Sequence, residues 1–284
     1  MLEYQENRKS TLPNPGILGP MQHALLMAFA GFASVGIAFS QTDPLVRSWE
    51  GEKKLIVVTT PHWDSVQGTL TRYEKQVIGD RGPGTGNSKT TATDGTWKQV
   101  GEPIPVVVGH GGLAWDPGLA RGHSDLYPGP VKHEGDGRSP AGAFPLNRGV
   151  FGFAVSLPGS RMYMPLTLTT ECVDDPASRY YTQIVDRAQV DRVDWNSSEK
   201  MRSVPGYRWG VVVNYNGDDP VRGDGSCIFV HQWSGPAGGT AGCTAMSRDN
   251  IETIVRWVDG KKRAALVQLP KSEYERLRKH WGLP

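Results

Sequence analysis

The sequence has few cysteines and almost no excess of either charge. Three cysteines in 284 residues exclude a fold held by many disulfides, and the odd count leaves at least one thiol unpaired within the chain. The 31 basic and 29 acidic residues give a net charge of only +2, which argues against an extended nucleic-acid surface. Hydrophobic residues make up 38% of the chain, so intrinsic disorder is excluded for most of it.

Two glycine-rich segments lack the residues that a nucleotide or esterase site needs. Residues 79–90 contain no Gly-Lys-Ser/Thr triplet, so no phosphate-binding loop is expected there. His110-Gly111-Gly112 resembles part of an esterase oxyanion loop, but no serine has glycines two residues before and two after it, so the nucleophile elbow is missing. Without HExxH or CxxC spacing we expect no metal and no cofactor, and we interpret His110, His123 and His133 as solvated loop residues.

The first forty residues are interpreted as a targeting segment. Ala24–Phe39 is an uncharged apolar run that ends near a small-residue pattern at Ser40. The run is shorter than the ~20 residues that span a bilayer, which favours a cleaved signal peptide over a buried helix or an uncleaved anchor. We therefore expect residues 1–40 to direct export to the periplasm or cell wall, residues 41–51 to be a linker, and no membrane span to remain after processing. An oxidising compartment would permit a disulfide.

The remaining chain, residues 52–284, is expected to be one mainly β domain with a few short helices. Thirty-five glycines and 21 prolines indicate many tight turns. Alternating or β-branched runs predict strands at Lys54–Thr60, Gln67–Val77, Trp97–Val100, Ile104–Gly109, Arg161–Thr169, Tyr207–Tyr215, Ser226–Trp233 and Ala264–Leu269. Helices are expected at Arg248–Asp259, after an N-cap at Ser247, and from about Ser272 to His280. Residues 109–149 are expected to form long loops.

The strongest chemical signal is a histidine followed by a cysteine in the segment 227–247, CIFVHQWSGPAGGTAGCTAMS. A strand delivers His231, and a glycine-rich loop returns Cys243 beside it, so the imidazole can act as a base for the thiol. Gly242 permits a tight turn that would leave the N–H groups of Gly242, Cys243 and Thr244 free for an oxyanion. We expect the Cys243 thiol to titrate below the ~8.5 of a free thiol. A small buried cysteine and a core histidine remain the alternative.

Two motifs together resemble the L,D-transpeptidase catalytic domain (YkuD-type). The first is the strand-borne His231 followed by Thr240-Ala241-Gly242-Cys243, similar to the family's His and Ser/Thr-x-Gly-Cys signature. The second is residues 134–144, EGDGRSPAGAF, similar to its GDGxTPxGxF stretch. The chain is closest to the branch that carries Glu171-Cys172-Val173-Asp174-Asp175-Pro176 and Tyr207-Arg208-Trp209-Gly210 between these motifs.

The resemblance implies a sandwich-like domain, with a motif-bearing core at about 104–270, that acts on peptidoglycan stem peptides as donor and acceptor. It implies Cys243 as nucleophile, His231 as general base and later acid, and the backbone carbonyl around Thr240 as the group that orients the imidazole. Trp233 and Arg248 are expected to contact substrate. Ala245 stands where the family often places Arg or Asn, which leaves Arg248 as the nearest guanidinium.

Other outcomes remain open from the sequence. An amine acceptor, either a second stem or a wall-attached lipoprotein, would give transfer, whereas water would give L,D-carboxypeptidase activity. A cysteine peptidase that cleaves cross-links and a non-catalytic wall-binding module are the further alternatives. Cys172 and Cys227 either form a disulfide or are separate core residues.

Overall fold

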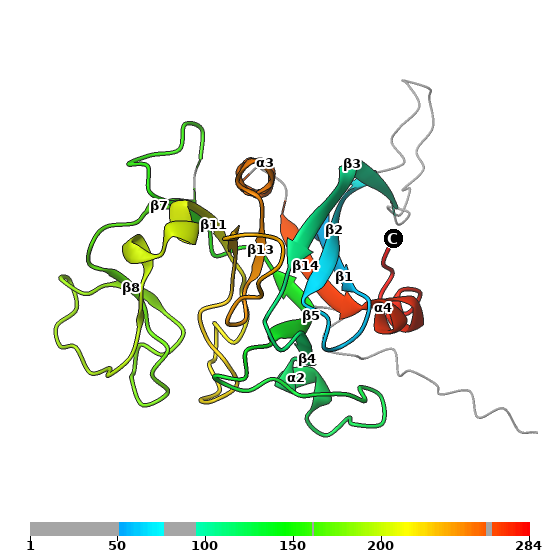
Figure 1. Cartoon of the computed structure of the whole chain (residues 1–284), viewed down its shortest axis with the longest axis horizontal. Coiled ribbons are helices and arrows are strands. Elements are labelled where there is room, and N and C mark those ends of the chain that lie inside the picture. The colour runs from blue at the N-terminus through cyan, green and yellow to red at the C-terminus, as the bar shows by residue number, and fades with distance from the viewer. Residues whose placement is uncertain (1–50, 77–94, 161, 260–262) are drawn as a thin grey trace, which may run out of the picture. The chain divides into compact units, whose positions relative to one another are not determined.

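The computed structural model describes residues 51–76, 95–160, 162–259 and 263–284. The expected targeting segment, residues 1–40, and nearly all of the expected linker lie outside the described residues. The described part is mainly β, as expected, and is organised around one large sheet (Figure 1). None of its helices is long and apolar enough to cross a membrane.

Eleven strands form the large sheet. In chain order they are β1 (Lys54–Thr60), β2 (Gln67–Gln76), β3 (Thr96–Val107), β4 (Leu113–Trp115), β5 (Ser139–Pro145), β6 (Val150–Gly152), β7 (Tyr163–Pro165), β11 (Trp209–Val212), β12 (Phe229–Gln232), β13 (Thr244–Met246) and β14 (Ala264–Pro270). In space they follow the order β4-β5-β14-β1-β2-β3-β13-β12-β11-β6-β7. The motif-bearing strand β12 therefore lies between β11 and β13.

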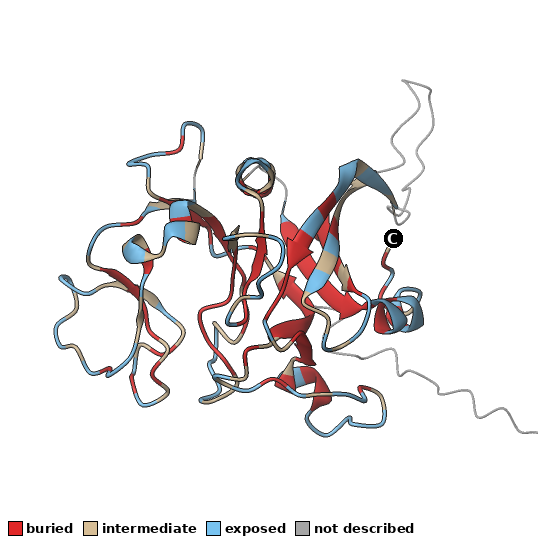
Figure 2. Cartoon of the chain, viewed as in Figure 1, coloured by how far each residue is buried: buried red, intermediate tan, exposed pale blue. Residues whose placement is uncertain are grey.

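The core follows from the apolar runs in the sequence. Strand β14, AALVQLP, is buried along its whole length and pairs in parallel with β1, as expected for near-continuous apolar strands covered on both faces. Helix α4 (Lys271–Leu277) packs on β14 and β1, and helix α3 (Arg248–Val258) packs on β11, β12 and β13. Figure 2 shows the buried residues concentrated on these strands.

Several element boundaries differ from those expected. The two strands predicted around residues 97–109 are one strand, β3, and its prolines are tolerated because β3 pairs with β13 only at Val107, so beside Pro103 and Pro105 the sheet continues on the β2 side alone. Residues 109–149 are not all loop, since they contain β4, β5 and the short helix α2 (Pro117–Ala120). The Ser247 side chain makes no cap hydrogen bond to α3.

A second, three-stranded sheet has the order β10-β8-β9, formed by β8 (Thr170–Cys172), β9 (Ile184–Asp186) and β10 (Glu199–Lys200). Two 3₁₀ turns, η1 (Met201–Ser203) and η2 (Pro205–Arg208), lead from β10 into β11. A disulfide joins Cys172 of β8 to Cys227, two residues before β12. The pairing that the sequence left open is therefore present, and it ties the small sheet to the motif-bearing strand.

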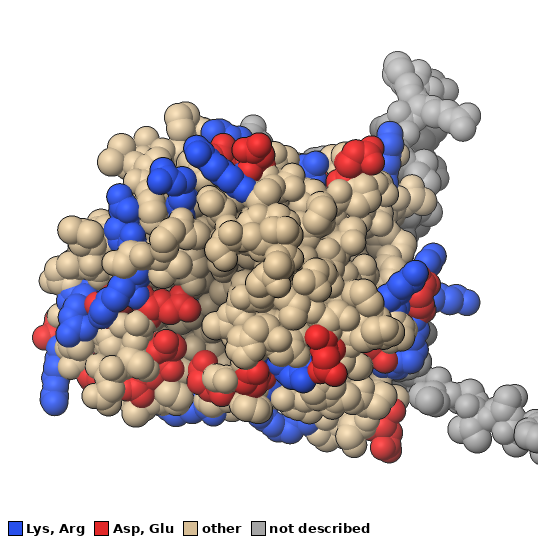
Figure 3. All heavy atoms as spheres, viewed as in Figure 1, with Lys and Arg blue, Asp and Glu red and all other residues tan. Residues whose placement is uncertain are grey.

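Charged side chains of both signs lie around the rim of the face drawn in Figure 3, with uncharged side chains across its middle. Lys and Arg side chains follow one another along the left side of this face (Figure 3), with Asp and Glu side chains beside them. The presence of both signs agrees with the small net charge of the chain.

Candidate active site

The strand register brings His231 and Cys243 to the same face of the sheet. Strands β12 and β13 run parallel, with His231 opposite Ala245, and opposite residues of such a pair point to the same side. Cys243 lies two residues before Ala245, so its side chain points to that side as well. The rings of Phe229 and His231 both contact Tyr207, so these two residues also share one face.

The Cys243 thiol is the free sulfhydryl of the chain and is buried, with the residue 6% exposed. The Phe229 N–H donates to Sγ over 3.3 Å, and the thiol reaches the Cys227 carbonyl at 3.6 Å. Burial raises the pKa of the thiol to about 12, and the negative charge of Glu199 adds to this rise. The expectation of a thiol that titrates below ~8.5 is therefore wrong for this structure: desolvation outweighs the hydrogen bonds that favour the thiolate.

Hydroxyl groups from both sequence motifs fix the backbone of the nucleophile. The Cys243 carbonyl accepts from Thr240 Oγ1 at 2.6 Å and from Ser139 Oγ at 2.9 Å. Ser139 in turn accepts from the Gly109 N–H at 2.8 Å. The second motif therefore supports the loop that carries Cys243.

The His231 imidazole is oriented by the carbonyl of the next residue. Nδ1 lies 2.7 Å from the Gln232 carbonyl oxygen, and because a carbonyl only accepts, Nδ1 carries the proton and Nε2 has the lone pair. Burial lowers the pKa of His231 to about 4, so the imidazole is neutral at pH 7. Among the described residues, no hydrogen bond joins this imidazole to the thiol, although such bonds often tighten only when substrate is bound.

The predicted role of the Thr240 carbonyl is wrong, because the imidazole bonds to the Gln232 carbonyl instead, and the Thr240 oxygen accepts from the backbone N–H of His110 at 2.8 Å. Gly206 explains why Gln232 takes this role. A Cβ at Gly206 would lie 2.5 Å from the Gln232 carbonyl oxygen and 3.1 Å from His231 Nδ1. Only glycine permits the η2 backbone to approach this hydrogen bond so closely.

Of the three expected oxyanion donors, two have other roles. The Gly242 N–H donates to Thr240 Oγ1 at 3.1 Å. This hydrogen bond lies within the turn, so the N–H is not free for an oxyanion. Thr244 is 2% exposed, pairs with Val230 in the sheet, and places its hydroxyl 2.6 Å from Gln268 Oε1. Within the described residues the Cys243 N–H has no hydrogen-bond partner, which leaves it as the remaining backbone donor beside the sulfur.

Trp233 and Arg248, the two residues expected to contact substrate, lie in different surroundings. Trp233 continues directly from β12 and is half-buried, with its N–H donating to the Met246 carbonyl. Arg248 pairs with Glu252 and lines a cavity of about 440 Å³ whose lining contains neither Cys243 nor His231. The reason is that β13 separates Cys243 from Arg248, and a strand rises by about 3.3 Å per residue.

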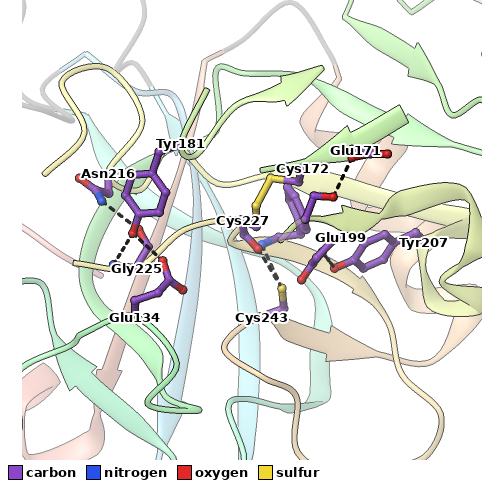
Figure 4. Close-up of a disulfide and its surroundings, with 12 residues drawn as sticks. Glu134, Glu171, Cys172, Tyr181, Glu199, Tyr207, Asn216, Gly225, Cys227 and Cys243 are labelled. Carbon is purple, nitrogen blue, oxygen red and sulfur yellow. Dashed lines mark hydrogen bonds between the residues drawn. A yellow bond between two sulfur atoms is a disulfide. The ribbon is translucent and has the colours of Figure 1, made fainter. Parts of the chain in front are cut away.

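Sequence reasoning missed Tyr207 and Glu199 as neighbours of the thiol. The Tyr207 hydroxyl donates to Glu199 Oε2 at 2.5 Å (Figure 4), and Tyr207 and Cys243 belong to one buried cluster. Burial raises the pKa of Glu199 to about 7. The Tyr-Arg-Trp-Gly stretch at 207–210 marked Tyr207, whereas no local pattern marked Glu199.

The other stretch between the two motifs, residues 171–176, organises the small sheet. Glu171 accepts hydrogen bonds from Trp195, Ser198 and Lys200, and its side chain is 2% exposed. Burial alone would raise the pKa of Glu171, but these hydrogen bonds outweigh it and lower the pKa to about 2. Asp175 accepts from the backbone N–H groups of Ala177 and Asn196. These residues are therefore structural.

In the part of the chain that the structure describes, no group of three or more His, Cys, Asp or Glu side chains is placed to hold a metal ion. His110 packs its ring against Gly137 next to the Cys243 loop, and its N–H holds Thr240. The site itself offers a buried thiol, a neutral imidazole and a backbone N–H.

Comparison with known proteins agrees with this geometry. The family model of the L,D-transpeptidase catalytic domain, YkuD, matches residues 96–268, a range that contains both motifs, the thiol and the imidazole. Neither the curated proteins nor the solved structures give a significant match. The chain belongs to the L,D-transpeptidase catalytic domain family.

Proposed function

We propose that the protein is a cysteine L,D-transpeptidase that acts on peptidoglycan stem peptides through a thioester on Cys243. The observation that carries the proposal is a free thiol and a neutral imidazole on one face of the β12–β13 pair, in a chain of this family. The donor is a stem tetrapeptide, and the acceptor is an amine of a second stem, which gives a 3-3 cross-link, or of a wall-attached protein.

In the proposed reaction the Cys243 sulfur attacks the carbonyl of the third, diamino-acid residue of the donor stem. His231 Nε2 takes the thiol proton and returns it to the leaving D-alanine amine. The Cys243 N–H donates to the oxyanion of the tetrahedral intermediate. An acceptor amine then attacks the thioester and gives its proton to Nε2, which passes it to the leaving sulfur and so restores the thiol and the neutral imidazole.

The buried thiol agrees with a nucleophile that ionises only in the presence of substrate. A thiol pKa of about 12 leaves little thiolate at pH 7, which limits oxidation and side reactions of the free enzyme. The disulfide between Cys172 and Cys227 favours an oxidising location, and it supports our further proposal that the protein is exported to the periplasm or cell wall.

The test is product analysis with the full-length protein and purified disaccharide tetrapeptide. We expect release of D-alanine and a dimer whose mass corresponds to two stems joined without the donor's D-alanine. Cys243→Ala should abolish both, while Tyr181→Phe, a change outside the site, should keep them. Tripeptide without dimer would favour the L,D-carboxypeptidase instead, and no conversion by the folded wild type would favour a wall-binding module.

A further inference from the structure

Tyr207 lies in the same buried cluster as the Cys243 thiol, and among the described residues no hydrogen bond joins His231 to that thiol. Tyr207 lies in η2, and its ring meets Phe151, Phe229 and His231 edge to face with centroids 5.1 to 5.5 Å apart. These contacts fix the ring, whose hydroxyl donates to the Glu199 carboxylate, and Cys243 lies in the same buried cluster. A phenol has one hydrogen to donate, so it cannot support both negative groups at the same time.

The backbone of Glu199 is fixed by strand pairing and, through the paired strand, by the disulfide. Its backbone pairs with Cys172 across the β10–β8 ladder, and Cys172 is bonded to Cys227, whose carbonyl touches the Cys243 thiol. Figure 4 shows the carboxyl of Glu199 turned toward the Tyr207 hydroxyl on the same side of the disulfide as Cys243. The carboxyl group is therefore fixed near the nucleophile without touching it.

We propose that Glu199 is a positioning residue that decides whether Tyr207 supports the Cys243 thiolate. When Glu199 is ionised, it holds the hydroxyl hydrogen and its charge opposes a second negative charge on the sulfur. When Glu199 is protonated, its new O–H donates to the Tyr207 oxygen, and the Tyr207 hydrogen turns to the sulfur. In this change the cluster of Glu199, Tyr207 and Cys243 gains one proton, which the carboxylate takes from solvent.

The surrounding charges favour a single negative charge in this cluster. Asp174 and Glu134 both act on Glu199 to oppose its ionisation, and burial acts in the same direction, which places the pKa of Glu199 at about 7. Lys132, ion-paired with Asp136, favours the Cys243 thiolate. His231 is neutral at this pH and adds no charge. Glu199 and Cys243 should therefore titrate as a coupled pair.

This inference rests on Cys243 being the nucleophile, and its test needs no peptidoglycan. The rate of Cys243 alkylation by iodoacetamide is measured from pH 5.5 to 9 on the full-length protein, with Cys243→Ser as the blank. For Glu199→Gln we expect alkylation at pH 8 to be about tenfold faster or more, since one pKa unit is tenfold in thiolate and a neighbouring like charge shifts a pKa by about one unit or more. On a logarithmic scale the wild-type rate should rise with pH, flatten near pH 7 as Glu199 ionises, and rise again, whereas the rate of the variant should rise without this inflection.

Tyr207→Phe separates the hydroxyl from the charge. It should slow alkylation about tenfold in the Glu199→Gln background, because the donor to the thiolate is lost. The matched control is Tyr181→Phe, since the Tyr181 hydroxyl also donates to a carboxylate, Glu134, at 2.5 Å, and this variant should stay within about twofold of wild type. An intact Cys172–Cys227 disulfide and an unchanged near-ultraviolet spectrum establish that each variant is folded.

The proposal is overturned if folded Glu199→Gln is alkylated no faster than wild type, or if Tyr181→Phe changes the rate as much as Tyr207→Phe does. The wild-type profile tests it without any variant, because a rate that rises with pH and shows no inflection near pH 7 would contradict the coupled pair. Failure of the proposed function would instead appear as product formation that survives Cys243→Ala, so the two failures are distinguishable.

Discussion

The large sheet and the small sheet of this protein are stabilised by different interactions. The large sheet buries a continuous apolar core, and its strands β1 and β14 are almost fully excluded from water. The small sheet has three short strands and depends on the buried carboxylate of Glu171, its cationic and polar donors, and one disulfide. Sheets this small have too little apolar surface to be stable alone.

The difference bears directly on the site. The large sheet presents Cys243 and His231 on neighbouring strands, while the small sheet and the turns that follow it bring Glu199 and Tyr207 to the same sulfur. The nucleophile therefore belongs to the sheet with the apolar core, and the groups that we propose set its protonation belong to the part held by polar and covalent bonds. Changes in the small sheet should alter the chemistry before they unfold the core.

Removing the disulfide should have the largest effect. The bond joins cysteines 55 residues apart in the sequence. For a loop of this length, the lost entropy of the unfolded chain stabilises the folded state by about 4 kcal/mol. In Cys172→Ser/Cys227→Ser we expect this loss in denaturant unfolding. Hydrogen exchange should accelerate in β8 and β9 while β1 and β14 keep their protection. Equal acceleration in both sheets would contradict the separation drawn here.

Removing the charge of Glu171 should have the next largest effect. Its pKa is about 2 in the folded protein against 4.5 unperturbed, so its ionised form contributes about 3 kcal/mol above pH 4.5, and this contribution is lost as the pH falls from 4.5 toward 2. Glu171→Gln should lose that amount at pH 7 and converge with wild type near pH 2, as measured by chemical denaturation. Glu275→Gln, which removes an exposed ion pair with Arg278, is the control and should cost less than about 0.5 kcal/mol.

Removing the hydroxyl of Ser139 should have the smallest effect on stability. Ser139→Ala should lower the free energy of unfolding by about 1–2 kcal/mol, because the buried Gly109 N–H loses its acceptor. It should nevertheless lower the transfer rate, since Ser139 also holds the Cys243 carbonyl in the large sheet. Thr253→Ala removes a hydroxyl bonded to the Asp249 carbonyl on α3 and is the matched control. If Thr253→Ala lowered the transfer rate as much, the effect of Ser139 could not be assigned to its hydrogen bond with the Cys243 carbonyl, and this prediction would be contradicted.

The parts that sequence predicted well are those governed by local pattern. The β-branched run at 54–60 and the amphipathic run at 248–258 form the expected strand and helix, because periodicity directly selects the element. Strand β5 was missed, since its alanines, glycine and prolines have low strand preference and only burial between β4 and β14 stabilises it. The approach of Glu199 to Cys243 was not predictable either, because it depends on a pairing between β10 and β8 that involves only two residues.

The expected thiol pKa was wrong for a related reason. Sequence proximity suggested an imidazole beside the sulfur, but desolvation depends on everything that packs around a group. Phe229, Tyr207 and the Cys227 backbone enclose the thiol, and none of these contacts can be read from the spacing of His231 and Cys243.

The central claim is that acyl transfer passes through a thioester on Cys243, and trapping that intermediate tests it most directly. The full-length protein is mixed with disaccharide tetrapeptide, quenched in acid within seconds, and digested for peptide mass mapping. We predict that the peptide containing Cys243 carries the mass of the donor stem without its D-alanine. We also predict that hydroxylamine removes this mass and that Cys243→Ala never shows it. A stem-derived adduct on any other residue, or product formed by Cys243→Ala, would contradict the account.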